Sequence, residues 1–334
     1  MVAPTRALII INKTAARARR AWPLIQATLA ESGVQYDTCE PAHAGDTEKE
    51  TRARLRAGYH TVAIVGGDGT LSEAASGFFE SCEESSNGMP PRAINERAAL
   101  AVLPAGTGDD FARGLAGKRE PLEKWLWRFI AHCRKEKMDD ESKNATISAV
   151  DLLYAMSDDG ARRFICLNAA TLGIGAEVAV RVAAQGRALR RLSGEARFAL
   201  AAVAALAAWR ERRVCVRVDG GEMIECATNL IAIVNGPFSG GGMNFSPTAE
   251  TTDGQLDVVT ACGVSRVGIL RELTRIHRGG HLANPKVRVV RGARVRVEAI
   301  NPRHDALGVE ADGDVRGATP IEFCVMPRAL RVIL

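Results

Sequence analysis

Between residues 61 and 80 the chain reads TVAIV-GGDGT-LSEAASGFFE. The pattern predicts a buried strand over 61–65 and a helix over 71–80, so the glycine-rich segment is a strand-to-helix turn. Such a turn lets the backbone approach a ligand closely, and the helix start offers unpaired N–H groups to phosphate oxygens. A carboxylate there repels phosphate unless a cation or a ribose hydroxyl intervenes, so Asp68 predicts Mg²⁺ beside a nucleotide. The alternative is a glycine-rich turn with a capping aspartate.

A second segment of this kind reads LPAGTGDDFAR over residues 103–113. It also leaves an apolar strand and enters a helix. We expect Thr107 to donate to a phosphate, and Asp109 and Asp110 to cap the helix or hold a metal. A structural N-cap explains one aspartate, but not easily the pair together with Gly-Thr-Gly.

Strands alternate with helices around both segments, which predicts a doubly wound, mostly parallel sheet with ligands at the carboxyl ends of its strands. The predicted strands are 7–11, 61–65 and 100–103. The predicted helices are 23–30, with Pro23 in its first turn, and 46–57, 71–80 and 121–133. Residues 81–97 are expected to form a surface insertion and 134–144 a linker.

The second half is predicted to be mainly β, with helices around 186–211 and 266–277. Its predicted strands are 146–156, 163–170, 214–218, 223–228, 230–234, 256–261, 287–300 and 321–326. Asp219-Gly220-Gly221 is typical of a hairpin turn. No internal repeat is visible.

The composition is that of an ordinary globular protein: 334 residues, 46% hydrophobic and 25% charged. This balance excludes disordered and collagen-like chains. The longest apolar run, 198–209, is shorter than the roughly 20 residues that a membrane-spanning helix needs. The eight cysteines show no zinc-ligand spacing. We expect most of them to be inert core thiols in a reducing cytoplasm.

The net charge of +5 is concentrated in arginine-rich clusters, which suit anionic partners, although solvated surface faces are the simpler interpretation. The clusters are Arg17, Arg19 and Arg20; Arg187, Arg190 and Arg191; Arg210, Arg212 and Arg213; and 286–296. With 5% aromatic residues and no stacking motif, nucleic acid is disfavoured. Small apolar residues surround the helix expected over 197–213, which favours a buried core helix over a membrane contact.

Both glycine-rich segments carry a resemblance. Gly66-Gly67-Asp68-Gly69-Thr70 with Glu73, followed by Gly106-Thr107-x-Asp109-Asp110-Phe111-Ala112-Arg113, resembles the lipid-kinase family that contains bacterial diacylglycerol kinases, sphingosine kinases and ceramide kinases. The first motif is shared with NAD kinases and phosphofructokinases, whereas the second is specific. Further matches lie at 167–173, 194–198, Asn235 with 240–242, 253–254, 312–314 and 327–332.

The resemblance implies an ATP-dependent lipid kinase that transfers the γ-phosphate to a lipid hydroxyl, such as that of diacylglycerol or a sphingoid base, with Mg²⁺ as cofactor. It implies an α/β nucleotide-binding domain over 1–138, a C-terminal β-sandwich domain for the lipid over 145–327, and a final strand, 328–334, that returns to the first domain. The active site would lie in the cleft between the domains.

The resemblance also assigns residues. Asp314 takes the place of the general base, with Asp68 and Asp110 beside the nucleotide metal. A structural Mg²⁺ would be held by Asp253 with backbone oxygens of Glu250 and Gln255. The implied ATP-site residues are Asn12, Gly66, Gly67, Asp68, Gly69, Thr70, Leu71, Ser72, Glu73, Gly106 and Thr107.

Several positions depart from the family pattern. The loop Asn-Pro-x-Ser-Gly is replaced by residues 12–16, NKTAA, where Lys13, Thr14 and Arg17 are candidate replacement donors. Asp109 and Ser72 each stand where the family has Asn. Asp314 replaces Glu and is shorter by one methylene, about 1 Å of reach. Asp312 is an alternative base, and 312–314 is alternatively a plain hairpin turn.

The implied location is cytoplasmic and peripherally membrane-associated, with the lipid taken from the membrane surface and arginine clusters contacting anionic headgroups. The oligomeric state is open, a homodimer included. Three alternative functions remain: a soluble-substrate kinase of the NAD kinase type, a nucleotide-binding regulator with a weakened active site, and a membrane-binding module without nucleotide. The last leaves both glycine-rich segments unexplained.

Overall fold

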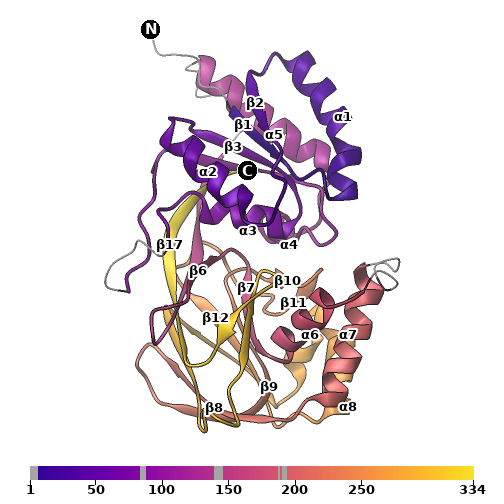
Figure 1. Cartoon of the computed structure of the whole chain (residues 1–334), viewed down its shortest axis with the longest axis vertical. Helices are drawn as coiled ribbons and strands as arrows, with labels where there is room; N and C mark the ends of the chain where they lie inside the picture. The colour runs from indigo at the N-terminus through magenta and orange to yellow at the C-terminus, as the bar shows by residue number, and fades with distance from the viewer. Residues whose placement is uncertain (1–6, 83–87, 139–145, 187–188, 190–193) are drawn as a thin grey trace. The chain divides into compact units, whose positions relative to one another are not determined.

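The computed structural model describes residues 7–82, 88–138, 146–186, 189 and 194–334, without the side chains of 135–138, 194, 195 and 198. The arginine cluster at 187, 190 and 191 lies outside these residues. The chain forms two compact units (Figure 1). Unit 1 comprises Met1–Asp151 and Arg328–Leu334, and unit 2 comprises Leu152–Pro327. The division between the two units falls inside strand β5 (Ile147–Ser157). The start of the second domain expected from the sequence is residue 145.

Unit 1 contains a parallel sheet in the order β2-β1-β3-β4-β17, which confirms the predicted α/β fold. Its strands are β1 (Ala7–Ile11), β2 (Tyr36–Cys39), β3 (Thr61–Gly66), β4 (Ala99–Pro104) and the end of β17 (Ile321–Ile333). Its helices are α1 (Ala16–Ser32), α2 (Asp46–Arg56), α3 (Asp68–Ser76), α4 (Asp110–Ala116) and α5 (Leu122–Met138). Helices α1 and α5 lie on one face of the sheet and α2 and α3 on the other (Figure 1). This is why β1 and β3 are mainly apolar and are buried along their whole length.

Three predicted helices in unit 1 have wrong boundaries. Helix α3, expected over 71–80, spans Asp68–Ser76, so Asp68, Gly69 and Thr70 are its first residues rather than part of the turn. Helix α1 begins at Ala16, so Pro23 lies inside it rather than in its first turn. Burial of Trp22, Ile25 and Leu29 offsets the hydrogen bond that proline removes. Helix α5 continues to Met138, so the first residues of the expected linker are helical.

Unit 2 is the expected β-sandwich-like domain, built mainly from antiparallel strands. Its strands are β5, β6 (Arg163–Cys166), β7 (Ala169–Gly173), β8 (Arg212–Val218), β9 (Ile224–Val234), β10 (Phe238–Ser239), β11 (Met243–Asn244), β12 (Leu256–Cys262), β13 (Val287–Gly292), β14 (Arg294–Ala299), β15 (Gly308–Ala311), β16 (Asp314–Ala318) and β17. Its helices are α6 (Ile174–Ala183), α7 (Gly194–Ala208) and α8 (Arg266–Arg275). One apolar core joins the strands to the inner faces of these three helices.

Two of the predicted long strands are interrupted, each by an aspartate from a distant turn. The stretch 287–300 divides at Ala293, where the carboxylate of Asp219 accepts the N–H groups of Ala293 and Arg294. The stretch 163–170 divides at 167–168, where the carboxylate of Asp312 does the same. In contrast, 223–228 and 230–234 form one strand, β9. A carboxylate can replace the partner strand as an acceptor, and so it ends the ladder locally.

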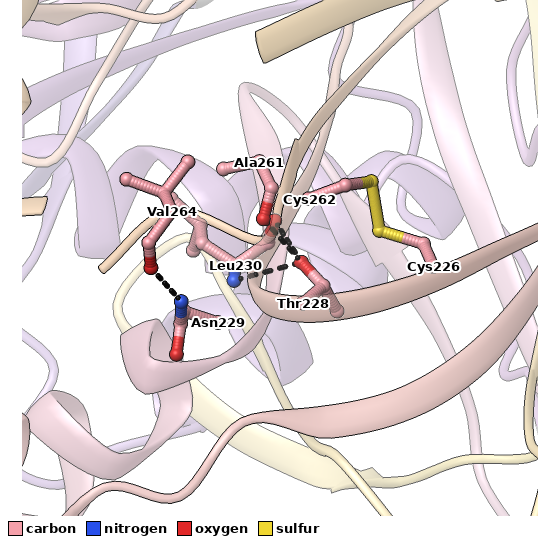
Figure 2. The surroundings of a disulfide bond; sticks show 7 residues. All are labelled: Cys226, Thr228, Asn229, Leu230, Ala261, Cys262 and Val264. Atoms are coloured by element: carbon pink, nitrogen blue, oxygen red, sulfur yellow. Dashed lines mark hydrogen bonds between the residues drawn. A yellow bond between two sulfur atoms is a disulfide. The ribbon is translucent and has the colours of Figure 1, made fainter. Parts of the chain in front are cut away.

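A disulfide joins Cys226 of β9 to Cys262 of β12 (Figure 2). The two Cα atoms are 5.5 Å apart, at the point where the register between the strands shifts. Beside it, the hydroxyl of Thr228 donates to the carbonyl of Ala261 and accepts from the N–H of Leu230. Most of the eight cysteines were expected to be inert core thiols, and this pair is an exception to that expectation. The other cysteines are partly or fully buried, and burial raises the pKa of Cys166 well above its ordinary value.

Candidate active site

In unit 1, three loops meet at the carboxyl ends of β1, β3 and β4. The side-chain amide of Asn12 donates to the hydroxyl of Thr70 over 2.8 Å. Arg17 donates to the carbonyl of Gly106 over 2.7 Å, and the N–H of Ala105 donates to the carbonyl of Gly66 over 2.8 Å. The two glycine-rich segments and the altered first loop therefore form one hydrogen-bonded structure, where ligands of parallel sheets bind.

The two glycine-rich segments touch through their backbones. A Cβ atom on Gly106 would lie 2.5 Å from the Cα of Gly67 and 2.8 Å from a carboxylate oxygen of Asp109. A Cβ on Gly67 would lie 3.1 Å from the Cα of Gly106. Side chains at either position would force the segments apart, so glycine is required here by close approach. The small pocket beside this contact is lined by Gly66, Gly67, Asp68, Leu71, Asp109 and Ala112, among others.

Asp68 is the first residue of α3, and its carboxylate accepts the N–H of Phe111 in α4 over 3.2 Å. Burial raises its pKa to about 6, and the charge of Asp110, which is buried in α4, adds to the shift. Two carboxylates held this close in a partly dry site are a suitable donor set for a hard divalent cation, which would relieve their repulsion. The residues present therefore fit the Mg²⁺ expected at this position.

Asp109, the residue that stands where the family has Asn, has a local structural role. Its backbone has a positive φ of 51°. One carboxylate oxygen accepts the N–H of Gly106 over 2.7 Å, and the other pairs with Arg119 at 2.9 Å. The extra negative charge is therefore compensated by a cation that the sequence did not single out.

The remaining predicted ATP-site residues differ in what they contact. Asn12 also orders its own loop, because its side-chain oxygen accepts the N–H groups of Thr14 and Ala15. Thr107 and Gly69 are exposed, whereas Ser72 is buried inside α3. The carboxylate of Glu73 accepts the N–H of Gly45 before α2. The candidate replacement donor Lys13 pairs with Glu40.

In unit 2, residues 312–313 form the two-residue turn of the β15–β16 hairpin. The carboxylate of Asp312 accepts three backbone N–H groups, those of Leu167, Asn168 and Ala169, at 2.6, 2.9 and 3.3 Å. This use of its carboxylate disfavours Asp312 as the base. The side chain of Asp314 is 66% exposed, and its carboxylate lies 3.2 Å from the guanidinium of Arg316.

The sequence did not single out Glu310, which fastens the same turn. Its carboxylate accepts the N–H of Gly313 and the hydroxyl of Thr171 on β7, each over 2.5 Å. Burial raises its pKa to about 7, and the carboxylates of Asp312 and Asp314 act in the same direction. The strand Gly308–Ala311 alternates between partly exposed and buried positions, so a polar residue at a partly exposed position gave no local signal.

Glu310→Gln is expected to change how stability depends on pH. The folded state holds the proton of Glu310 more tightly than the unfolded state, so wild-type stability falls as pH rises from about 4.5 to about 7. The Glu310→Gln variant does not lose stability in this way, because glutamine does not titrate. Its melting temperature relative to wild type should therefore rise by a few degrees between about pH 5 and about pH 8. Parallel curves of melting temperature against pH would contradict this.

The set expected to hold a structural Mg²⁺, which is Asp253 with backbone oxygens of Glu250 and Gln255, stays a prediction. Asp253 accepts the N–H of Gln255 over 3.0 Å and pairs with the guanidinium of Arg291, which also contacts Asp257. Glu250 is exposed. Within the described residues, no group of three or more His, Cys, Asp or Glu side chains is placed to hold a metal. In this structure the carboxylate of Asp253 pairs with a guanidinium, and no step of the reaction is assigned to a metal there.

Two family models match the chain. The diacylglycerol kinase catalytic domain matches residues 6–161, and the YegS C-terminal NAD kinase beta sandwich-like domain matches residues 170–334. Together the matches span most of the sequence. The protein belongs to the diacylglycerol kinase family of lipid kinases. It is a phosphotransferase that acts on an alcohol group, as the resemblance implied.

Named relatives agree with this family. A diacylglycerol kinase of Mycobacterium tuberculosis (strain H37Rv) is 28% identical over 309 residues, covering 92% of this chain and 87% of the relative. A probable lipid kinase YegS-like of Stenotrophomonas maltophilia (strain K279a) is 29% identical over 227 residues, 68% of this chain and 64% of the relative. The crystal structure of a diacylglycerol kinase from Bacillus anthracis (strain Sterne) has the same fold, with a TM-score of 0.67 at 18% identity over 100% of this chain and 98% of that one.

Proposed function

We propose that this lipid kinase transfers the γ-phosphate of ATP to the hydroxyl of a lipid such as diacylglycerol or a sphingoid base. The observation that carries the proposal is the meeting of the two glycine-rich segments, where the helix start at Asp68 and the carboxylate of Asp110 lie beside exposed backbone. This arrangement suits a triphosphate with its metal. The hydroxyl acceptor follows from the family to which the chain belongs.

Unit 1 binds the nucleotide in this mechanism. The N-terminal turn of α3 and the exposed hydroxyl of Thr107 donate to the phosphates, while Asn12 and Arg17 fix the surrounding loops. Asp68 and Asp110 would hold Mg²⁺, which would neutralise charge on the transferring phosphoryl group when bound. Phosphoryl transfer depends mainly on such positioning and charge neutralisation.

Unit 2 supplies the proton acceptor in this mechanism. Asp314 accepts the proton of the lipid hydroxyl, and Arg316 lies beside its carboxylate. Glu310 and Asp312 fix the turn from which Asp314 projects. The lipid comes from a membrane that the protein contacts peripherally, on the cytoplasmic side. No helix among the described residues has the length and apolarity to pass through a bilayer.

The test is incubation with labelled ATP, Mg²⁺ and a panel of diacylglycerol, monoacylglycerol, sphingoid bases, ceramide and polyprenols in mixed micelles. Transfer to none of these by folded protein that binds ATP would overturn the proposal. The exposed position of Asp314 gives a second candidate, a nucleotide-binding regulator, which binds ATP without turnover. ATP-dependent phosphorylation of NAD would instead indicate a soluble-substrate kinase.

Asp314→Ala is expected to lower kcat by roughly 10²–10⁴-fold, because a general base contributes about that much. Nucleotide affinity should be nearly unchanged. Asp314→Glu, which restores the longer side chain of the family, should keep at least the wild-type kcat. An unchanged kcat in Asp314→Ala would remove Asp314 from the role of base, and a low kcat in both the wild type and Asp314→Glu would favour the regulator.

A further inference from the structure

Helix α7 is half exposed, and its exposed face is apolar. Ala201, Ala205 and Leu206 are buried in the core of unit 2. On the opposite face, Leu200 is 48% and Val203 55% exposed, and their exposed neighbours are alanines. Between Arg197 and Arg210 the sequence has no charged residue. The prediction of a buried core helix is therefore wrong, because small residues all round the helix hide which side packs.

Helices α6 and α8 also carry exposed apolar side chains. Val267 and Leu270 of α8 are 77% and 42% exposed, and Val180 of α6 is 47% exposed. Five of the twelve large apolar side chains that are exposed in the described part of the chain thus lie on α6–α8. The start of α8 is held at the end of α7, since Arg266 donates to the carbonyl of Trp209 over 2.5 Å. All three helices place their inner faces on the same core.

Arginines accompany these exposed apolar residues. Arg210, Arg271 and Arg278 are exposed at the end of α7, on α8 and just beyond it. The acidic residues of α6 and α8 are already neutralised, because Glu177 pairs with Arg181 and Glu272 with Arg275. Glu211, also exposed, is the single acidic residue of the segment 210–213, which holds three arginines. Among the side chains that the structure describes on and next to these helices, the balance of charge is therefore positive.

We propose that these residues form a docking surface for a bilayer that contains anionic lipids. We call it the α6–α8 face, defined by Val180, Leu200, Val203, Val267 and Leu270 with Arg210, Arg271 and Arg278. Interfacial helices bury leucine and valine at the boundary between headgroups and acyl chains, and each nearby arginine strengthens binding to anionic lipid. The proposal rests on the proposed lipid kinase function and names the surface by which the enzyme meets its substrate.

Charge decides between a bilayer and a second copy of the chain. A two-fold contact between copies would bring the same patch of both copies together, arginines included. Like charges facing each other across such a contact oppose association. Anionic headgroups instead complement these arginines while the apolar residues enter the membrane.

The experiment is co-sedimentation of the full chain with phosphatidylcholine vesicles, with and without phosphatidylglycerol. Wild-type protein should bind the anionic vesicles. The double variant Val203→Asp with Leu270→Asp should bind them at least about tenfold more weakly, since burying carboxylates at this depth is unfavourable. Arg271→Gln should weaken binding only to vesicles that contain phosphatidylglycerol. Met223→Asp, at an exposed apolar residue in the same unit, is the matched control and should bind like wild type.

Phosphorylation of a short-chain diacylglycerol below its micelle concentration separates this proposal from the proposed function. The double variant should retain wild-type kcat on this dispersed acceptor, and an equal melting temperature shows that it folds. Vesicle binding equal to wild type in the double variant overturns the docking surface. So does a wild-type dimer, measured by ultracentrifugation, that the double variant converts to monomer. Wild-type binding to vesicles without phosphorylation of any acceptor overturns the proposed function alone.

Discussion

Asp68→Asn is expected to lower kcat by about 10²–10³-fold, the loss typical of removing one electrostatic contact to the transferring group. The same variant should melt at a higher temperature than wild type near neutral pH. Burial raises the pKa of Asp68 to about 6, so its ionised form is costly in the folded protein without ligand, and a neutral amide avoids that cost. Initial rates with saturating ATP and Mg²⁺, and melting curves without ligand, measure the two effects.

Asp109→Asn is the matched control for this variant. Asparagine keeps the side-chain oxygen that accepts the N–H of Gly106, and it loses only the pairing with Arg119. Its kcat should stay within a few-fold of wild type. If Asp68→Asn and Asp109→Asn lose activity equally, or if Asp68→Asn keeps wild-type activity, Asp68 does not hold the metal.

Asp312→Ala is expected to cost about 2–5 kcal/mol of unfolding free energy in unit 2, because three backbone N–H groups lose their acceptor at once. It should also abolish most activity, since the turn that carries Asp314 loses its attachment to residues 167–169. Calorimetric unfolding and activity per folded molecule measure the two effects. Asp312→Asn retains one acceptor oxygen and should fall between Ala and wild type.

Asp219→Ala separates destabilisation from loss of the site. Asp219 fastens the β8–β9 turn in a similar way, through the N–H groups of Ala293 and Arg294. It should also destabilise unit 2, but activity per folded molecule should stay near wild type. Equal activity losses in Asp219→Ala and Asp312→Ala would mean that Asp312 acts only through stability.

The sequence was sufficient to predict what local pattern determines. The strand and helix around Asp68 differ in hydrophobic period, and glycines mark the turn between them, so the position of the loop and the fold of unit 1 followed directly. The resemblance singled out Asp314, which the structure places at the start of β16 directly after the turn. The role of Asp109 did not follow, because Arg119 lies ten residues away with no motif to connect them.

What the sequence missed depends on contacts between distant residues. Asp312 interrupts a strand about 145 residues earlier, and Cys226 pairs with Cys262 across a sheet whose register no spacing reveals. Glu310 resembled any polar residue in an alternating strand until Thr171 was placed opposite it. The exposed face of α7 was missed for a different reason, because alanine is equally compatible with a core and with a surface.

Strand β17 imposes an order on synthesis. Its residues Arg331–Ile333 pair with Ala99–Ala101 of β4 and cover one edge of the unit 1 sheet. On the ribosome, the chain makes β4 early and its neighbour only after all of unit 2 has been translated. Until then nascent unit 1 carries an open strand edge, the kind of surface that pairs with other chains. This half of the enzyme is therefore complete only after the other half has been made, and interrupted translation leaves a fragment with an aggregation-prone edge.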